Sequence, residues 1–206
     1  MGTRVYAGLS AEQRADRRRE QLLEAGLDVF AEQGWVGSTV QDLCRAAGLS
    51  PRYFYELVDS REALFLAVTA RIAEQVAEVV QVALAGSDAD PDSRARAVLT
   101  ALAGYFAADE RVVRVALVES MANEQFRAQR RELLAGFASS AARLMRPLRS
   151  GPAGGVAVRR RLELSAIVLT GGMVEALIAW TGEGRPLRTE LFVDHLTDLH
   201  AAAAQL

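Results

Sequence analysis

An arginine and two tyrosines stand close together in the stretch SPRYFYE, from Ser50 to Glu56. Serine followed by proline is typical of a helix start, with Ser50 as the cap and Pro51 in the first helical position. On a helix of this register Phe54 faces the core, whereas Arg52, Tyr53 and Tyr55 are left outside. Guanidinium and phenol groups form directed hydrogen bonds to base edges and phosphates. The pattern therefore favours recognition chemistry rather than covalent catalysis.

A second helix start precedes this stretch, at Ser38-Thr39. Thr39 is a suitable cap, and Asp42 adds an acidic residue in the first turn, as in a capping box. Gly48 predicts the end of this helix and a tight turn into the next one. Helix, glycine-containing turn and helix together form the helix-turn-helix pattern, whose second helix enters the DNA major groove.

This pattern predicts which residues meet DNA. The N-terminal end of the second helix should face base edges, where arginine pairs with guanine and glutamine with adenine. The free N–H groups at both helix starts suit phosphate oxygens. From spacing, we expect base-facing positions at Pro51, Arg52, Tyr53 and Gln41, and phosphate-facing helix starts at Ser38, Thr39 and Ser50.

The composition restricts the other possibilities. The chain has 206 residues, 50% hydrophobic and only 6% aromatic, which favours an all-α protein. The net charge of −2 gives no global basic field, so DNA binding must depend on local geometry. One cysteine, and two histidines five residues apart (His195 and His200), predict no metal site and no cofactor. Without an apolar leader or a long uncharged apolar run, we expect a cytoplasmic chain outside the membrane.

Hydrophobic periodicity predicts about nine helices and two domains. Residues 1–62 should form a three-helix helix-turn-helix domain with a loose N-terminal arm at 1–10, and residues 63–206 a larger helical domain. Turn-rich breaks stand at Ala85–Ser93, Arg149–Gly155 and Gly182–Pro186. The helices are expected at about 10–34, 39–47, 51–58, 59–84, 93–108, 110–121, 124–148, 157–182 and 187–204.

The last two helices are expected to form a homodimer interface. One helix-turn-helix reads only a half-site, so two copies are needed. Between Leu164 and Trp180 apolar residues lie almost all round the helix, so that one side is available to a partner. The predicted interface residues are Leu164, Val168, Val174, Ile178, Phe192, His195, Leu196 and Leu199. Gly171-Gly172 within the first of these helices indicates close helix packing or room for a ligand, with packing favoured.

The segment from Arg18 to about Val68 closely resembles the DNA-binding domain of the TetR family of bacterial transcriptional regulators. The resemblance rests on A…F…G (Ala25, Phe30, Gly34), T-x-x-D (Thr39, Asp42), A-G-L-S (Ala47–Ser50), Tyr55, and S-[KR]-E-x-L (Ser60–Leu64). It departs from the family pattern at Glu56 and Leu57, where an aromatic residue or histidine is usual.

The resemblance implies specific contacts. Thr39, Tyr55 and Arg61 match positions that hold phosphate in the family, and Pro51, Arg52 and Tyr53 match the variable positions that read bases. A carboxylate at Glu56 would be repelled by phosphate unless it turns away or pairs with Arg52.

The resemblance also implies a small-molecule effector pocket within residues 85–180. Polar residues inside apolar helices and large apolar residues nearby are the candidates, although each could equally be an ordinary core or surface position. They are Tyr105, Phe106, Glu119, Met121, Phe126, Thr170, Met173 and Glu175.

The leading hypothesis is a dimeric repressor that an effector releases from double-stranded operator DNA. A helical ligand-binding dimer without a competent DNA head is the alternative, since Glu56 and the lack of basic excess favour it. An all-α enzyme is less favoured, because the sequence has no metal-ligand cluster, phosphate loop or nucleophile-base set.

Overall fold

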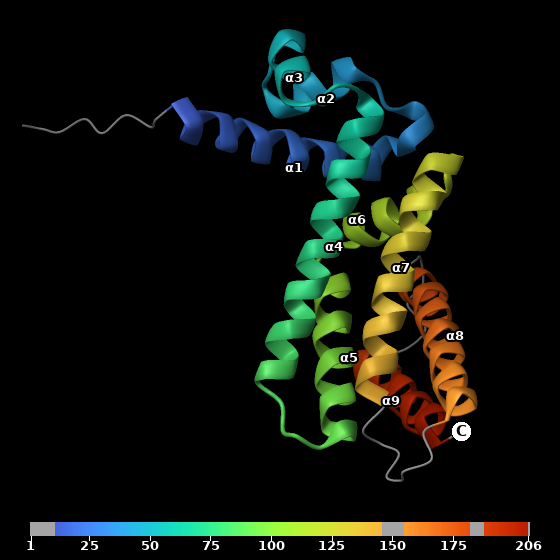
Figure 1. Ribbon diagram of the computed structural model, residues 1–206. Helices are drawn as coiled ribbons and strands as arrows, with labels where there is room; N and C mark the ends of the chain where they lie inside the picture. Colours follow the sequence, from blue (N-terminus) through green and yellow to red (C-terminus); the bar gives the residue numbers. More distant parts are fainter. Residues whose placement is uncertain (1–10, 146–154, 182–187, 206) are drawn as a thin grey trace, which may run out of the picture. The chain divides into compact units, whose positions relative to one another are not determined.

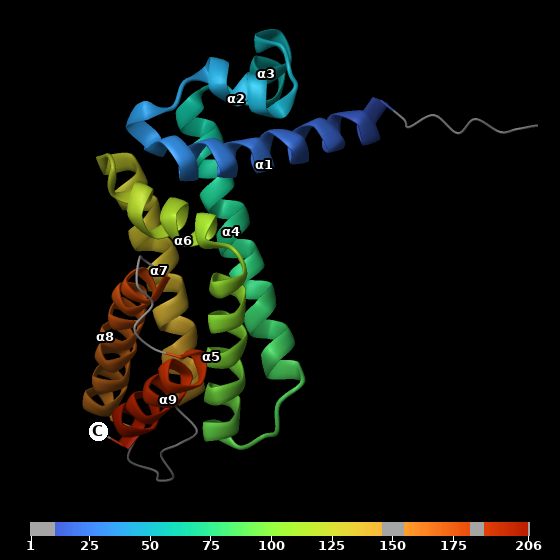
Figure 2. The ribbon, with the colours of Figure 1, turned by 180° about the vertical axis from the view of Figure 1, so that it is seen from behind.

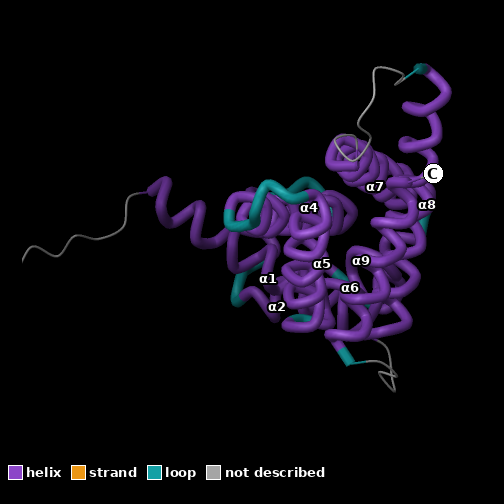
Figure 3. The backbone as a smooth tube through the Cα atoms, turned by 90° about the horizontal axis from the view of Figure 1, so that it is seen from below, coloured by secondary structure: helices purple, strands orange, loops and turns teal. Residues whose placement is uncertain are grey.

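The computed structural model describes residues 11–145, 155–181 and 188–205, and in these ranges every regular element is a helix (Figures 1 and 3). The predicted all-α class is confirmed. The chain divides into two compact units, one ending at Val68 and the other beginning at Thr69. The expected arm at 1–10, most of the loop Arg149–Gly155 and the break Gly182–Pro186 lie outside the described residues.

The first unit contains α1 (Ala11–Gly37), α2 (Val40–Ala47), α3 (Pro51–Leu57) and the first residues of α4 (Arg61–Ala85). Helix α1 packs on α2, and α2 packs on α3. The rings of Phe30 and Phe65 meet edge to face, with centroids 5.1 Å apart. The core of this unit is formed by large side chains that are almost completely buried: Leu22, Phe30, Leu43, Phe54, Leu64, Phe65 and Val68.

Two glycines with positive φ set the chain direction in this unit. Gly34, with φ 71° and ψ 168°, interrupts α1 before its last turn. Gly48, with φ 63° and ψ 30°, ends α2 in the left-handed conformation, and its N–H donates to the Arg45 carbonyl at 3.3 Å. Only glycine adopts such angles at little cost. Both helix ends expected from the sequence are therefore present, with a short helical extension beyond Gly34.

The second unit contains the rest of α4 with α5 (Pro91–Ala108), α6 (Glu110–Val113), α7 (Glu124–Met145), α8 (Val156–Thr181) and α9 (Thr189–Gln205). Helix α7 packs along α8, and α9 packs obliquely against α5 (Figures 1 and 2). The α7–α8 contact is close because small residues line it: Ala138, Ala142 and Ala166, with Leu162. Helices α8 and α9 are joined by the stacked rings of Trp180 and Phe192, 4.7 Å apart.

The segment after α5 differs from the single helix predicted for 110–121. It begins as α6, widens to a π-helix at Arg114–Val118, and tightens to a 3₁₀ turn at Glu119–Met121. The Asp109 carboxylate caps α6 by accepting from the Arg111 N–H at 3.0 Å. Val115 and Leu117 are both buried in the core. Residues two apart point to different sides of a regular α-helix, so the change of winding explains why both are buried. The predicted helix was therefore wrong in its winding, though not in its extent.

Candidate nucleic-acid interface

The start of α2 is fixed by a reciprocal capping box. The Thr39 hydroxyl accepts from the Asp42 N–H at 3.2 Å, and the Asp42 carboxylate accepts from the Thr39 N–H at 3.1 Å. The hydroxyl also donates to that carboxylate at 2.5 Å. This hydrogen bond is the main reason why the pKa of Asp42 lies below its usual value. The predicted cap is present, and it engages the Thr39 side chain that the sequence predicts to meet phosphate.

Helix α3 begins as predicted, with Ser50 as its cap and Pro51 in the first turn. The Ser50 hydroxyl accepts from the Tyr53 N–H at 3.4 Å. Phe54 is completely buried, whereas Tyr53 and Tyr55 are 44% and 57% exposed. The register of α3 therefore divides the three aromatic residues between core and surface as expected.

Arg52 lies on the exposed side of α3, one turn before Glu56. Its Nε donates to a Glu56 carboxylate oxygen at 3.0 Å, and the two side chains are 85% and 48% exposed. A guanidinium has five N–H donors, so this contact leaves the Nη edge able to form two parallel hydrogen bonds. The anomalous carboxylate at Glu56 is thus paired with the predicted base-reading residue.

Tyr53 is in contact with α1. The guanidinium carbon of Arg18 lies 5.2 Å from the centre of the Tyr53 ring, within the range of a cation–π interaction. This contact places a positive charge beside the exposed face of α3. Sequence reasoning missed it, because residues 35 positions apart on different helices give no periodic signal.

Arg61, at the start of α4, faces the protein. Its Nη1 donates to the Trp35 carbonyl at 3.1 Å and also to the Ser38 carbonyl. Its guanidinium carbon lies 3.9 Å from the centre of the Trp35 ring. The charged end of this predicted phosphate contact is therefore occupied by groups of its own domain.

The other predicted DNA contacts differ in accessibility. Gln41, Ser50 and Pro51 are exposed. Ser38 is 1% exposed, and its hydroxyl donates to the Trp35 carbonyl at 3.0 Å. The Ser38 side chain is therefore turned into the junction between α1 and α2, and a phosphate contact at this helix start stays a prediction.

The predicted effector residues divide into buried and exposed positions in the second unit. Phe106, Phe126 and Thr170 are buried, Met173 is partly buried, and the Tyr105 hydroxyl donates to the Gln75 side chain at 2.9 Å. Burial is the main cause that raises the pKa of Tyr105. By contrast, Glu175 is exposed on α8. Glu175 therefore occupies a surface position of its own chain, and its role as an effector residue stays a prediction.

Two further predicted effector residues lie where the 3₁₀ turn leads into α7. The Glu119 side chain is 17% exposed, with the Arg114 guanidinium 3.8 Å away. Met121 is 48% exposed.

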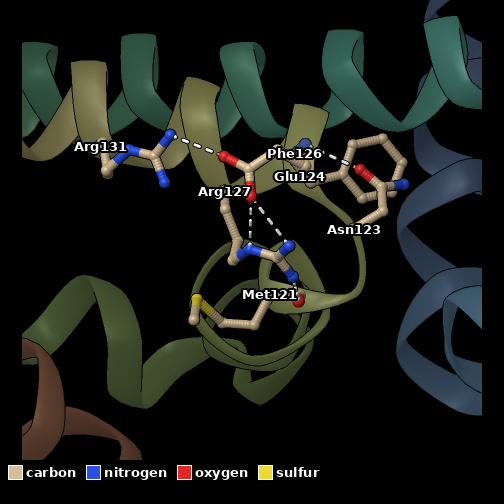
Figure 4. A network of polar contacts seen from close by, with 6 residues as sticks. All are labelled: Met121, Asn123, Glu124, Phe126, Arg127 and Arg131. Atoms are coloured by element: carbon tan, nitrogen blue, oxygen red, sulfur yellow. Dashed lines mark hydrogen bonds and ion pairs between the residues drawn. The ribbon is translucent and has the colours of Figure 1, made fainter.

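A polar network fixes the start of α7 beside Met121 (Figure 4). Arg127 donates to the Met121 carbonyl at 3.0 Å and to the Glu124 carboxylate at 2.9 Å. Arg131 adds a further hydrogen bond to Glu124 at 3.0 Å, and these partners lower the pKa of Glu124. The Asn123 side chain caps the helix by accepting from the Phe126 N–H at 2.9 Å.

The predicted dimer residues also divide into two groups. Leu164, Val168 and Leu199 are 61%, 64% and 43% exposed, and His195 is exposed as well. Ile178 and Leu196 are partly buried. Val174 and Phe192 are 4% and 6% exposed, because they pack within their own chain. The expectation that these last two face a partner is not met.

The glycine pair in α8 lies beside the exposed apolar residues. A Cβ atom added at Gly171 or Gly172 would meet nothing within 4 Å. Close packing within the chain therefore does not explain the pair, and close packing against a second copy stays a prediction. In the described ranges no group of three or more His, Cys, Asp or Glu residues could hold a metal ion.

Comparison with known proteins places this helix-turn-helix in a family. Residues 22–68 match the family model for bacterial regulatory proteins of the tetR family. The HTH-type transcriptional repressor NicS of Pseudomonas putida is 25% identical over 141 residues, 68% of this chain and 65% of NicS. The repressor AcnR of Corynebacterium diphtheriae is 38% identical over 63 residues, 31% of this chain and 33% of AcnR. The matched region thus spans less than two thirds of either relative.

The fold as a whole is also shared. The transcriptional regulator FadR of Bacillus subtilis, solved in complex with stearoyl-CoA, superposes with a TM-score of 0.73. The superposition covers 89% of this chain and 98% of that one, at 15% sequence identity. At this identity the likeness concerns the fold alone.

Proposed function

The chain belongs to the TetR family of bacterial regulatory proteins, and on that premise we propose that it is a DNA-binding transcriptional repressor. The observation that carries the proposal is the exposed side of α3. It presents the Nη edge of Arg52 and the exposed rings of Tyr53 and Tyr55, which follow Arg52 one and three residues later. Arg52 would read guanine, and the Tyr55 hydroxyl would hold a phosphate.

We propose that a homodimer carries two such reading heads. The exposed apolar residues Leu164, Val168 and Leu199 supply a self-complementary surface on α8 and α9. Two recognition helices would then lie about 34–36 Å apart, or a multiple of that distance, and match successive turns of one DNA face.

The proposed control is release of the operator by a small molecule bound in the second unit. An effector that binds better to a state with wrongly spaced recognition helices shifts the population away from DNA. Helix α4 is the proposed connection, because the boundary between the units falls within it, after Val68. The cytoplasm is the expected location of such a regulator.

DNA binding is tested by selection from a random pool of duplexes, followed by fluorescence anisotropy across a salt series. A saturable, salt-sensitive complex with a consensus sequence is expected. Tyr55→Phe should weaken binding to every duplex alike, since only a phosphate contact is lost. Tyr105→Phe removes only a hydroxyl in the second unit, away from the helix-turn-helix, and serves as the matched control. Failure to enrich any sequence would contradict the proposal.

The alternative is a ligand-binding dimer whose DNA head is not competent. The Arg52–Glu56 ion pair and the net charge of −2 favour it, because both reduce the attraction to phosphate. Absence of duplex enrichment, together with thermal stabilisation by a small molecule, would support this alternative. Stearoyl-CoA is a reasonable member of the compound set, given the ligand of the Bacillus FadR.

A further inference from the structure

We infer that Arg61 is a positioning residue that fixes the start of α2, and that it does not act as a ligand of DNA phosphate. The inference rests on the proposed DNA-binding function. It concerns the junction of residues 35–39, which begins directly after the break at Gly34 and ends at the cap of α2.

The junction has backbone acceptors that α1 cannot satisfy. The last carbonyls of a helix have no partner within that helix. Arg61 Nη1 donates to the carbonyls of Trp35 and Ser38, and the Ser38 hydroxyl donates to the Trp35 carbonyl at 3.0 Å. Ser38 is 1% exposed, so water does not substitute for these donors. One guanidinium thus joins the end of α1 to the residue before Thr39.

An aromatic surface holds the guanidinium in place. Its central carbon lies 3.9 Å from the centre of the Trp35 ring. That indole is 8% exposed and packs against Phe30 and Phe65, with ring centroids 5.9 and 5.6 Å away. Stacking a planar cation on a ring while donating two hydrogen bonds is a property of arginine that lysine lacks.

This geometry has a consequence for DNA binding. To reach a phosphate, the guanidinium would have to leave the Trp35 ring and both carbonyls. While it stays, it holds Ser38 directly beside Thr39, whose reciprocal cap with Asp42 starts α2. Arg61 would therefore act on DNA through the placement of α2, and its charge would not displace counterions.

The test compares Arg61→Lys and Arg61→Ala with the wild-type chain, using the duplex that the wild type selects from a random pool. A phosphate ligand contributes about 0.9 to the slope of log affinity against log salt, whereas a positioning residue leaves that slope unchanged. We expect both variants to lose about tenfold in affinity, which corresponds to the loss of a hydrogen bond from a charged group. The slope of log affinity against log salt should stay at the wild-type value. Arg17→Lys makes the same exchange at an exposed position of α1 in the same unit and is the matched control.

A second readout does not depend on DNA. In a Trp180→Phe background, Trp35 is the remaining tryptophan, and its emission should change in Arg61→Lys but not in Arg17→Lys. Amide hydrogen exchange at residues 40–47, which form α2, should also become faster in Arg61→Lys. If Arg61→Lys matches the wild type in all of these measurements and Arg61→Ala lowers the slope by about one, the inference is overturned. If the wild type selects no duplex, the proposed function fails, whereas emission and exchange still decide the position of Arg61.

Discussion

Arg52 and Glu56 show how one ion pair can prepare a residue for base recognition. An exposed pair of this kind contributes little to stability, about 0.3–0.5 kcal/mol at i, i+4 spacing. Its importance is geometric, because the contact at Nε leaves the two Nη groups in one plane and restricts the rotamers of Arg52. The same carboxylate repels phosphate, which weakens binding to any sequence.

We predict that Glu56→Gln raises the affinity for arbitrary duplexes and lowers the discrimination against the wrong base at the position read by Arg52. Loss of the negative charge removes repulsion from phosphate, and loss of the strong acceptor frees the arginine rotamers. Competition between selected and random duplexes measures both effects. Glu78→Gln, which removes an exposed carboxylate of α4, should change neither quantity.

Arg52→Ala is expected to remove that discrimination, by about 1–3 kcal/mol at one base pair. When binding is measured with a series of duplexes that differ only at this base pair, the affinities of the Arg52→Ala variant for the members of the series should converge. If the preference for guanine survived the substitution, another residue would be the reader.

At the scale of single elements, the sequence predicted most where local chemistry determines structure. Thr39, Gly48 and the Ser50-Pro51 pair each act within one turn of their own backbone, and the structure has the caps that they predict. It predicted least where tertiary packing decides. The π-helix at Arg114–Val118 and the burial of Val174 and Phe192 depend on neighbouring helices, which periodicity along one helix does not reveal. The contacts of Arg18 and Arg61 have the same origin.

Gly48 provides a test of the turn between α2 and α3. Its φ of 63° costs a residue with a Cβ about 1–2 kcal/mol, so Gly48→Ala should lower the free energy of unfolding by about that amount. Gly104 lies exposed within α5, and a Cβ there would meet nothing within 4 Å. Gly104→Ala should therefore stabilise the chain, by up to about 1 kcal/mol. Urea denaturation measures both, and equal effects of the two substitutions would contradict the assigned turn.

His200 on α9 links packing to pH. Burial lowers the pKa of His200 below its usual value of 6.5, while the nearby Asp92 carboxylate on α5 opposes the shift. Below pH 6.5 the unfolded chain therefore binds a proton that the folded chain does not, and stability falls as the pH falls through that range. We expect the decrease in melting temperature between pH 7.5 and 5.5 to be smaller in His200→Gln than in the wild type. Because each protein is compared with itself, the structural cost of the substitution cancels; equal decreases would contradict the lowered pKa.

At the scale of the whole molecule, α8 has more apolar surface than its own chain covers. By length and composition the segment Val158–Thr181 could cross a membrane, and 28% of its most apolar window is buried within the chain. A helix at a subunit interface passes the same test, so this property alone is weak evidence of insertion. Leu164, Ile167 and Val168 recur at i, i+3 and i+4, which places them on one exposed face. A second copy of the chain is the partner that the proposed half-site reading requires.

Val168→Glu tests this face directly. Val168 is 64% exposed, so glutamate costs the isolated chain little, but in a dimer the charge would be buried without a partner, which is strongly unfavourable. In analytical ultracentrifugation, we expect the wild type to sediment as a dimer and the variant as a folded monomer. The variant should also lose affinity for a duplex with the full operator, whereas it should still bind a duplex with a single half-site. Val82→Glu makes the same exchange at a 66% exposed position of α4 and should leave both measurements unchanged. If Val168→Glu remained dimeric, the subunit contact would have to lie elsewhere, and the exposed face of α8 would need another partner.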